Sequence, residues 1–321
     1  MKRLLFFIVI IFICNDFYSQ DGDTKVNYER KTFVYKIVGQ DSICADFYEI
    51  SNDHIIRPVI VWIHGGALIW GSRNSLPVEQ LEFYLQAGYS VLSIDYRLAP
   101  ETKLEEIFED IKDAIIWTKY NSTKLQIDPK KIFVIGHSAG GYLALMTGYR
   151  LENPPCAIIS FYGYGDIQGE WINRPDTSYI NWEHISKEKA FSQIHSSTIT
   201  HASSKDRFNF YLYCRQQGIW AEIITGQDPV TESGYLEQFC PVKNIHANFP
   251  PVLLIHGDRD TDAPFEQSLL LNEELSLKNV DHQLIRMTGF DHAFDKFEGG
   301  FDNNQIRDAF VEVIKFMNKY K

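Results

Sequence analysis

Short runs of β-branched and apolar residues alternate along the chain with longer segments whose apolar residues recur every three or four positions. The short runs predict strands, and the longer segments predict helices that pack on a core through one face. Strands are expected at 32–38, 43–50, 58–63, 90–94, 131–135, 157–161, 252–255 and 282–287, and helices at 77–87, 104–120, 142–149, 265–277 and 305–320.

Regular alternation of strands with helices indicates an α/β protein with right-handed crossovers and a mostly parallel sheet. No helix separates the first two strands, so they are expected to form an antiparallel edge. The helix at 104–120 has a clear apolar stripe. Its predicted core face consists of Leu104, Ile107, Phe108, Ile111, Ile115 and Ile116.

The alternation stops between residue 163 and about residue 244, where the chain is polar and rich in aromatic residues. Two pieces of this insertion, 186–194 and 205–217, have helix-like patterns. A structureless loop of this length is improbable in a compact domain, which favours a helical cap over the C-terminal edge of the sheet. The alternative is a surface excursion unrelated to substrate.

The N-terminus has the pattern of an export signal. Met1-Lys2-Arg3 is a positive segment, the run at 4–13 is apolar, and Ser19, Gln20 and Asp21 follow. Residues 1–20 are therefore predicted to be a cleaved signal peptide, leaving 21–321 as a secreted or periplasmic protein of one domain that includes the insertion. An uncleaved anchor is the alternative, but the apolar run is shorter than a membrane span, so no stable membrane insertion is expected after cleavage.

The charge balance narrows the choice of partners. The chain carries 31 Lys and Arg against 42 Asp and Glu, a net charge of −11, which disfavours nucleic acid and anionic membranes as partners.

The cysteines give no sign of a metal site. No CxxC pattern occurs, so no cysteine zinc site is expected. Export would allow disulfides, but the wide spacing shows no disulfide framework, and Cys156 is expected to be a buried free thiol. The cysteines are Cys14, Cys44, Cys156, Cys214 and Cys240.

The pentapeptide GHSAG at 136–140 reads G-x-S-x-G and lies between a predicted strand and a predicted helix. A serine on such a turn is lifted out of the sheet, and the helix N-terminus beneath it favours a developing anion. The pattern alone would also suit an ordinary glycine-rich turn. Its position between strand and helix favours Ser138 as a nucleophile.

A serine nucleophile needs a base and an orienting acid. In a sheet of this type, the acid follows the serine along the chain and the histidine follows the acid. Asp258, Asp260 and Asp262 all follow the strand at 252–255, and each could instead be a loop or helix-capping residue. His292 follows a glycine turn after the last strand and is the expected base. The expected roles of His137, His256 and His282 are structural.

A glycine pair also follows the strand at 58–63, in the motif HGGA at 64–67. Glycines let backbone N–H groups face a site without interference from side chains. We expect Gly65 and Gly66, together with the N–H of Ala139, to form an oxyanion hole. A plain glycine turn is the alternative.

Four ordered motifs resemble the α/β-hydrolase superfamily, in the esterase/lipase branch related to hormone-sensitive lipase: HGGA at 64–67, DYRLAPE at 95–101, GHSAGG at 136–141 and HGDRD at 256–260. The resemblance runs from about residue 30 to the C-terminus except for the insertion. It implies an eight-stranded, mostly parallel sheet, no cofactor or metal, and Asp260 as the acid, four residues after His256 and four before Pro264. Ala67 stands where the family often has a third glycine. The insertion follows the sixth predicted strand, whereas lids in the family lie at the N-terminus, so the resemblance gives no expectation about a lid in this chain.

These features predict a serine carboxylic-ester hydrolase that forms an acyl-enzyme on Ser138, acting on small esters or extracellular saccharide esters. One alternative is a peptidase of the prolyl oligopeptidase type, although no propeller-sized extension is present in the sequence. The other is a catalytically silent, ligand-binding member of the fold. Retention of Ser138, Asp260 and His292 argues against the silent alternative.

Overall fold

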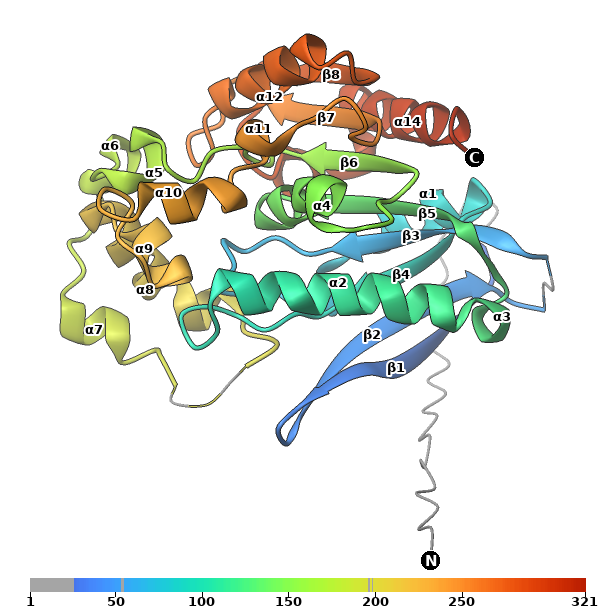
Figure 1. Ribbon diagram of the computed structural model, residues 1–321, viewed down its shortest axis with the longest axis horizontal. Coiled ribbons are helices and arrows are strands. Elements are labelled where there is room, and N and C mark those ends of the chain that lie inside the picture. The colour runs from blue at the N-terminus through green and yellow to red at the C-terminus, as the bar shows by residue number, and fades with distance from the viewer. Residues whose placement is uncertain (1–25, 53–54, 196, 198) are drawn as a thin grey trace, which may run out of the picture.

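A sheet of eight strands runs through the centre of the described protein (Figure 1). The computed structural model describes residues 26–52, 55–195, 197 and 199–321, so the expected signal peptide lies outside the described residues. The strands are β1 (Tyr28–Val38), β2 (Asp41–Ile50), β3 (Arg57–Ile63), β4 (Ser90–Ile94), β5 (Ile127–His137), β6 (Ala157–Phe161), β7 (Val252–Gly257) and β8 (His282–Met287).

The strand order is β1-β2-β4-β3-β5-β6-β7-β8. β2 pairs antiparallel with both β1 and β4, and every later pairing in the sheet is parallel. The predicted mostly parallel sheet with an antiparallel N-terminal edge is therefore confirmed. Parallel strands bring their carboxyl ends to one edge of the sheet, where the loops that follow β3, β5, β7 and β8 can meet.

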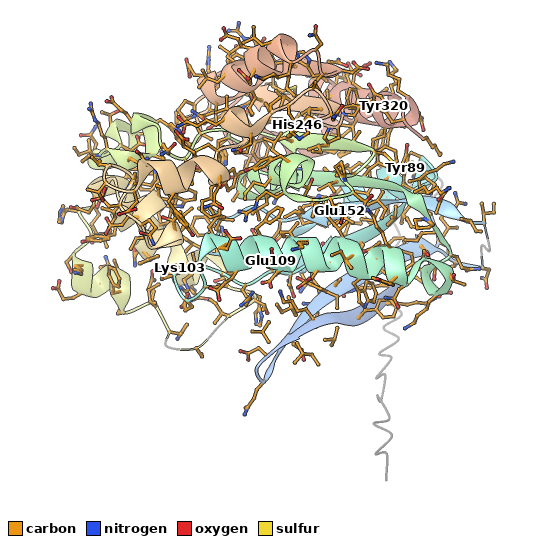
Figure 2. The ribbon with its side chains drawn as sticks, in the orientation of Figure 1. Tyr89, Lys103, Glu109, Glu152, His246 and Tyr320 are labelled. Atoms are coloured by element: carbon orange, nitrogen blue, oxygen red, sulfur yellow. The ribbon has the colours of Figure 1, made fainter. Side chains whose placement is uncertain are left out.

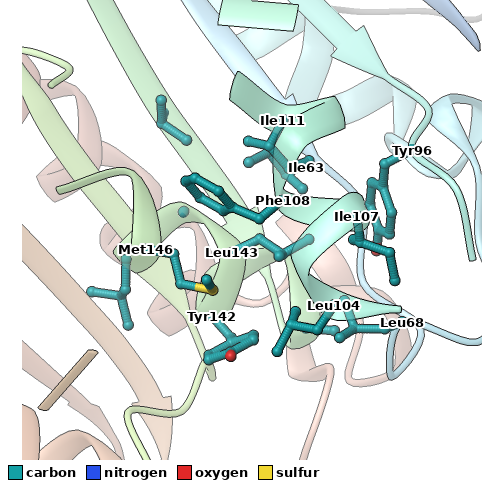
Figure 3. Close-up of a cluster of buried hydrophobic side chains, with 14 of the residues drawn as sticks. Ile63, Leu68, Tyr96, Leu104, Ile107, Phe108, Ile111, Tyr142, Leu143 and Met146 are labelled. Carbon is teal, nitrogen blue, oxygen red and sulfur yellow. The ribbon is translucent and has the colours of Figure 1, made fainter. Parts of the chain in front are cut away.

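Helices cover both faces of the sheet, and each face has its own apolar core. α2 (Leu104–Tyr120), α4 (Ala139–Arg150) and α12 (Glu266–Leu277) pack on one face, and α1 (Val78–Gln86) and α14 (Asn304–Asn318) on the other. Figure 3 shows part of the first core, with Ile107 and Phe108 of α2 and Leu143 and Met146 of α4 among its buried side chains. The smaller elements outside the insertion are η1 (Arg73–Ser75), α3 (Ser122–Leu125), α13 (Phe294–Phe297) and η3 (Gly300–Asp302).

The α2 stripe was predicted correctly except at its last member. Ile116 is 39% exposed, whereas Ile111 and Ile115 are buried. One residue beyond Ile115 is a rotation of about 100° around a helix, which turns Ile116 out of the stripe.

Cys156 is free as predicted but only partly buried, because it lies at the start of β6, where its thiol donates to the Lys130 carbonyl oxygen at 2.9 Å. The three other described cysteines are also free.

The insertion between β6 and β7 folds into short helices at the left of Figure 1, beside the carboxyl ends of the strands. Lys103, at the start of α2, is labelled in Figure 2 and donates from Nζ to the Ile223 carbonyl oxygen at 2.7 Å, which ties the insertion to the sheet domain. The expected helix at 186–194 is shorter in the structure. The elements are α5 (Glu170–Asn173), α6 (Thr177–Ile180), α7 (Lys187–Phe191), α8 (Ser204–Gln217), α9 (Trp220–Thr225), α10 (Ser233–Leu236), η2 (Glu237–Phe239) and α11 (Pro241–Asn244). We call this insertion the cap.

Among the described residues, every helix is too short or too polar to span a membrane.

Candidate active site

Ser138 occupies a strained turn between β5, which ends at His137, and α4, which begins at Ala139. Its φ of 55° and ψ of −121° are unfavourable for a residue with a side chain, and such strain is typical of functional sites. The flanking glycines make the turn possible. A Cβ on Gly136 would lie 2.0 Å from the Gly140 carbonyl oxygen, and one on Gly140 would lie 2.2 Å from the Ile63 carbonyl oxygen.

The structure brings Ser138, His292 and Asp260 together from three separate loops. His292 Nε2 lies 3.0 Å from Ser138 Oγ, and His292 Nδ1 lies 2.7 Å from Asp260 Oδ2. A neutral imidazole that donates from Nδ1 to Asp260 can accept the Ser138 hydroxyl proton at Nε2. This is the hydrogen-bond chain that activates a serine hydroxyl.

Only one of the three candidate aspartates contacts His292 Nδ1. Asp260 is fixed there, because its other oxygen accepts the backbone N–H groups of Asp262 and Ala263 at 2.9 and 2.8 Å. Asp258 instead accepts from Arg286 Nε at 2.9 Å and from the Gly289 N–H at 2.6 Å. The geometry therefore favours Asp260 as the acid.

Asp262 lies on the opposite side of the imidazole from Asp260. Its Oδ2 is 3.5 Å from His292 Nε2, and its Oδ1 accepts hydrogen bonds from the cap residues Tyr179 at 2.9 Å, Arg215 at 3.0 Å and Tyr211. Asp262 is therefore adjacent to the reactive atoms and also tied to the cap.

The charges of these carboxylates set the protonation of the site. Burial lowers the pKa of His292, but the carboxylates of Asp260 and Asp262 outweigh burial and raise this pKa to about 9. Burial raises the pKa of Asp260, but the neighbouring imidazoles of His292 and His256 hold it well below its usual range. Asp260 is thus ionised at neutral pH, as an orienting acid must be.

The three histidines with expected structural roles lie away from the reactive atoms, and His137 and His256 are fully buried. His256 Nε2 is 3.1 Å from Asp260 Oδ2 and 2.9 Å from the Ala263 carbonyl oxygen, so it supports the acid loop. His137 stacks on Phe161 with ring centroids 4.5 Å apart, and its Nε2 lies 3.4 Å from Asp295. His282 is partly buried, with Nδ1 2.7 Å from the Val280 carbonyl oxygen.

The expected oxyanion-hole residues lie around Ser138. A Cβ on Gly65 would be 3.2 Å from Ser138 Cβ, so the HGGA loop runs directly past the nucleophile. Gly66 has a φ of 110°, and its carbonyl oxygen accepts the N–H groups of Ile69 and Trp70, which turns the loop. Ala139 opens α4, so its N–H has no acceptor within the helix. These N–H groups are candidates to bind an oxyanion.

A narrow cavity opens beside Ser138, mostly between the cap and the sheet domain. Cap side chains supply its aromatic walls and its one cation, Arg215. Arg215 was not among the site residues predicted from the sequence. Nothing in its sequence context marked it, because α8 has no distinct apolar stripe from which an inward face could be read. The lining residues are Ala67, Ser138, Tyr164, Trp171, Ile172, Tyr211, Arg215, Trp220, Asp262 and Ala263.

A mostly parallel eight-stranded sheet, with Ser138 on a strand-to-helix turn and His292 and Asp260 on later loops, defines an α/β hydrolase. The BD-FAE family matches residues 45–275, and the dienelactone hydrolase family matches residues 240–321. The chain belongs to the BD-FAE family, within the esterase branch of the α/β-hydrolase superfamily.

Curated relatives include the non-reducing polyketide synthase atr1 of Stereocaulon alpinum, 28% identical over 84% of this chain. Another is the non-reducing polyketide synthase Preu6 of Preussia isomera, 26% identical over 84% of this chain. The chain spans only 12% and 14% of the lengths of these two proteins.

Solved structures with the same fold include a Staphylococcus aureus protein of unknown function, with a TM-score of 0.72 at 24% identity, covering 88% of this chain and 96% of that one. Propionate-bound esterase 2 of Thermogutta terrifontis has a TM-score of 0.65 at 22% identity, covering 90% of this chain and 94% of that one. At these identities the likeness concerns the fold.

Proposed function

We propose that the protein is a serine carboxylic-ester hydrolase that forms an acyl-enzyme on Ser138. The observation that carries the proposal is the hydrogen-bond chain from Ser138 Oγ through His292 to Asp260, with distances of 3.0 and 2.7 Å. Membership of an esterase-branch family supports it. As part of the proposal, the predicted signal peptide directs this activity to substrates outside the cytoplasm, such as small esters or acylated saccharides.

In the proposed reaction, Ser138 Oγ attacks the ester carbonyl carbon while His292 Nε2 takes the hydroxyl proton. The tetrahedral oxyanion is bound by the N–H groups of Gly65, Gly66 and Ala139. His292 then gives its proton to the departing alcohol oxygen. Asp260 stabilises the imidazolium through Nδ1 and holds the tautomer. Water repeats the cycle on the acyl-enzyme, releases the carboxylic acid and restores Ser138.

A neighbour of the same fold supports short acyl groups as the acid half of the substrate. The esterase 2 of Thermogutta terrifontis, which shares the fold, has been solved with propionate and with butyrate. We extend short acyl groups to the present protein as part of the proposal.

The test is hydrolysis of p-nitrophenyl acetate by the wild type and by Ser138→Ala, with labelling by a fluorophosphonate as a second readout. The variant should lose turnover by a factor of about 10⁴ or more and should not be labelled. Asp260→Asn should lose a comparable factor, whereas Asp258→Asn, whose carboxylate pairs with Arg286, should retain activity. Full activity in Ser138→Ala would overturn the proposal.

The same preparations separate the two alternatives. A prolyl oligopeptidase-type peptidase would hydrolyse a proline amide in preference to the acetyl ester. A silent binding protein would neither turn over the ester nor react with the fluorophosphonate. Neither result is expected, because the aligned Ser138 and His292 favour a reactive serine.

A further inference from the structure

Asp262 presents one carboxylate oxygen to the cap and the other to the reactive atoms. Three cap donors, from Tyr179, Tyr211 and Arg215, converge on Oδ1. Oδ2 lies 3.5 Å from His292 Nε2, and Asp262 lines the cavity beside Ser138. Because Oδ1 is held by several donors, Oδ2 is fixed in position and remains able to accept a hydrogen bond from a ligand.

Two further residues that line the same cavity each carry an unpaired polar atom. Arg215 Nε and Tyr164 Oη are buried and have no hydrogen-bond partner among the described residues. The Arg215 side chain is 3% exposed and Tyr164 is 4% exposed, and both residues line the cavity. Buried polar groups are nearly always paired in folded proteins, so unpaired ones at a cavity wall point to a polar ligand.

The position of Oδ2 relative to His292 decides which half of an ester it would meet. In ester cleavage, Nε2 delivers its proton to the oxygen of the departing alcohol. An acceptor 3.5 Å from Nε2 therefore lies next to that oxygen, where the alcohol half of the substrate begins. A hydroxyl group on the neighbouring carbon could donate to Oδ2 while the ester oxygen faces Nε2.

We propose that Asp262, Arg215 and Tyr164 form a subsite for a hydroxyl group on the alcohol half of the substrate. The substrates are then mono-esters of polyols, such as sugars, in which a free hydroxyl neighbours the acylated one. This inference rests on the proposed function, because it assigns the subsite by its place beside the proposed base. A hydroxyl both donates and accepts, which matches an acceptor in Asp262 and a donor in Arg215.

The aromatic walls agree with this class of substrate. Trp171, Tyr211 and Trp220 line the cavity beside the polar atoms. Aromatic faces cover the apolar C–H surface of a polyol, while the carboxylate and guanidinium address its hydroxyl groups. A simple alkyl ester would place carbon atoms against Asp262 Oδ2 and supply no donor to it, which is unfavourable.

The test compares 2-hydroxyethyl acetate with propyl acetate, which have almost the same size and differ in a terminal hydroxyl against a methyl group. The wild type should favour the hydroxyethyl ester in kcat/KM by about tenfold or more, as expected for a hydrogen bond to a charged group. The ratio of two substrates on one enzyme cancels changes that affect Ser138 and His292 equally.

In Asp262→Asn the preference should fall to about threefold or less. The cap donors require an oxygen at the Oδ1 position, so the amide nitrogen would replace Oδ2, and the charged acceptor would be lost. Asp258→Asn is the matched control, since Asp258 lies in the same loop, pairs with Arg286 and does not line the cavity. It should keep the wild-type preference.

A second measurement uses the wild type alone and does not depend on a variant that folds. The acyl-enzyme can pass its acetyl group to an added alcohol: the alcohol oxygen attacks the carbonyl carbon, its proton goes to His292, and Ser138 Oγ leaves and takes that proton. Ethylene glycol should accept the acetyl group about tenfold faster than 1-propanol, counted per hydroxyl group, because its second hydroxyl can hydrogen-bond to the charged Asp262.

Equal kcat/KM for the two esters in the wild type would overturn this inference and leave the proposed function standing. An undiminished preference in Asp262→Asn would overturn the assignment to Asp262. If neither ester were hydrolysed and wild type and Ser138→Ala were equally inactive, the proposed function itself would fail, and this inference with it.

Discussion

Trp220 of the cap donates its indole N–H to the carbonyl oxygen of Ala67, 3.0 Å away, although 153 residues separate them in the chain. Ala67 and Leu68 are consecutive residues with positive φ, 53° and 64°, a strained conformation for residues with side chains. The cap thus helps to hold the loop whose preceding residues, Gly65 and Gly66, are the proposed oxyanion donors. Trp220 is a positioning residue for that loop.

Replacing Trp220 with Phe should lower kcat by about tenfold. Full loss of one oxyanion donor lowers kcat by a factor of about 10²–10³, and a misplaced loop should weaken that donor without removing it. The aromatic ring remains, so KM should change little. A transition-state analogue such as a trifluoromethyl ketone should bind about tenfold more weakly, in step with kcat. Steady-state kinetics on p-nitrophenyl acetate and inhibition constants measure both quantities.

Trp117→Phe is the matched control for the loss of an indole N–H. Trp117 lies near the far end of α2 and packs on Phe33, away from the cavity. Its activity should equal that of the wild type. A Trp220→Phe enzyme with a raised KM, unchanged kcat and unchanged analogue affinity would show that Trp220 shapes the cavity without positioning the loop.

The protonation of His292 gives a prediction for pH dependence. The base must be neutral to accept the Ser138 proton, and its pKa is raised to about 9. Activity should therefore rise with pH and approach its maximum only above that value. Asp262→Asn removes one of the charges that raise the pKa, so its rising limb should lie at lower pH. Profiles of kcat/KM, corrected for spontaneous hydrolysis, measure both.

Asp258→Asn should leave the rising limb where it is in the wild type, since Asp258 is not among the groups that raise the pKa of His292. A wild-type profile that is already flat at pH 7 would contradict the raised pKa. A limb that does not move in Asp262→Asn would show that its carboxylate does not act on His292 in the working enzyme.

The sheet domain was predictable because its elements are long or sharply bounded. The strands 90–94, 157–161 and 282–287 and the helix 104–120 have the predicted bounds, since each apolar pattern ends at a turn or polar segment. α4 begins three residues before the expected start. Helix propensity is weak for its glycines, and the turn at Ser138 sets where the helix begins.

The cap was predictable only in outline. Helices of four to six residues, such as α5, α6 and α9, are too short to show a periodic pattern, and tertiary contacts hold them in place. The site was predictable to a larger extent. Chain order and spacing singled out Ser138 and His292, and the family resemblance pointed to Asp260. The contact between Asp260 and His292 Nδ1 is the physical observation that distinguishes Asp260 from Asp258 and Asp262.

The cap is also fixed by a buried ion pair, which gives a prediction for stability. Arg207 of α8 pairs with Glu101 at 2.7 Å, and their side chains are only 1% and 2% exposed. Removing one partner leaves an uncompensated buried charge, so Glu101→Gln should reduce the free energy of unfolding by about 3–5 kcal/mol. The double variant Glu101→Gln/Arg207→Met removes both charges and should recover part of that loss. Urea denaturation measures each value.

Glu170→Gln is the control within the cap, because its partner Arg174 is exposed, and it should change stability by less than about 1 kcal/mol. A loss of that small size in Glu101→Gln would mean that the Glu101–Arg207 pair does not hold the cap in place.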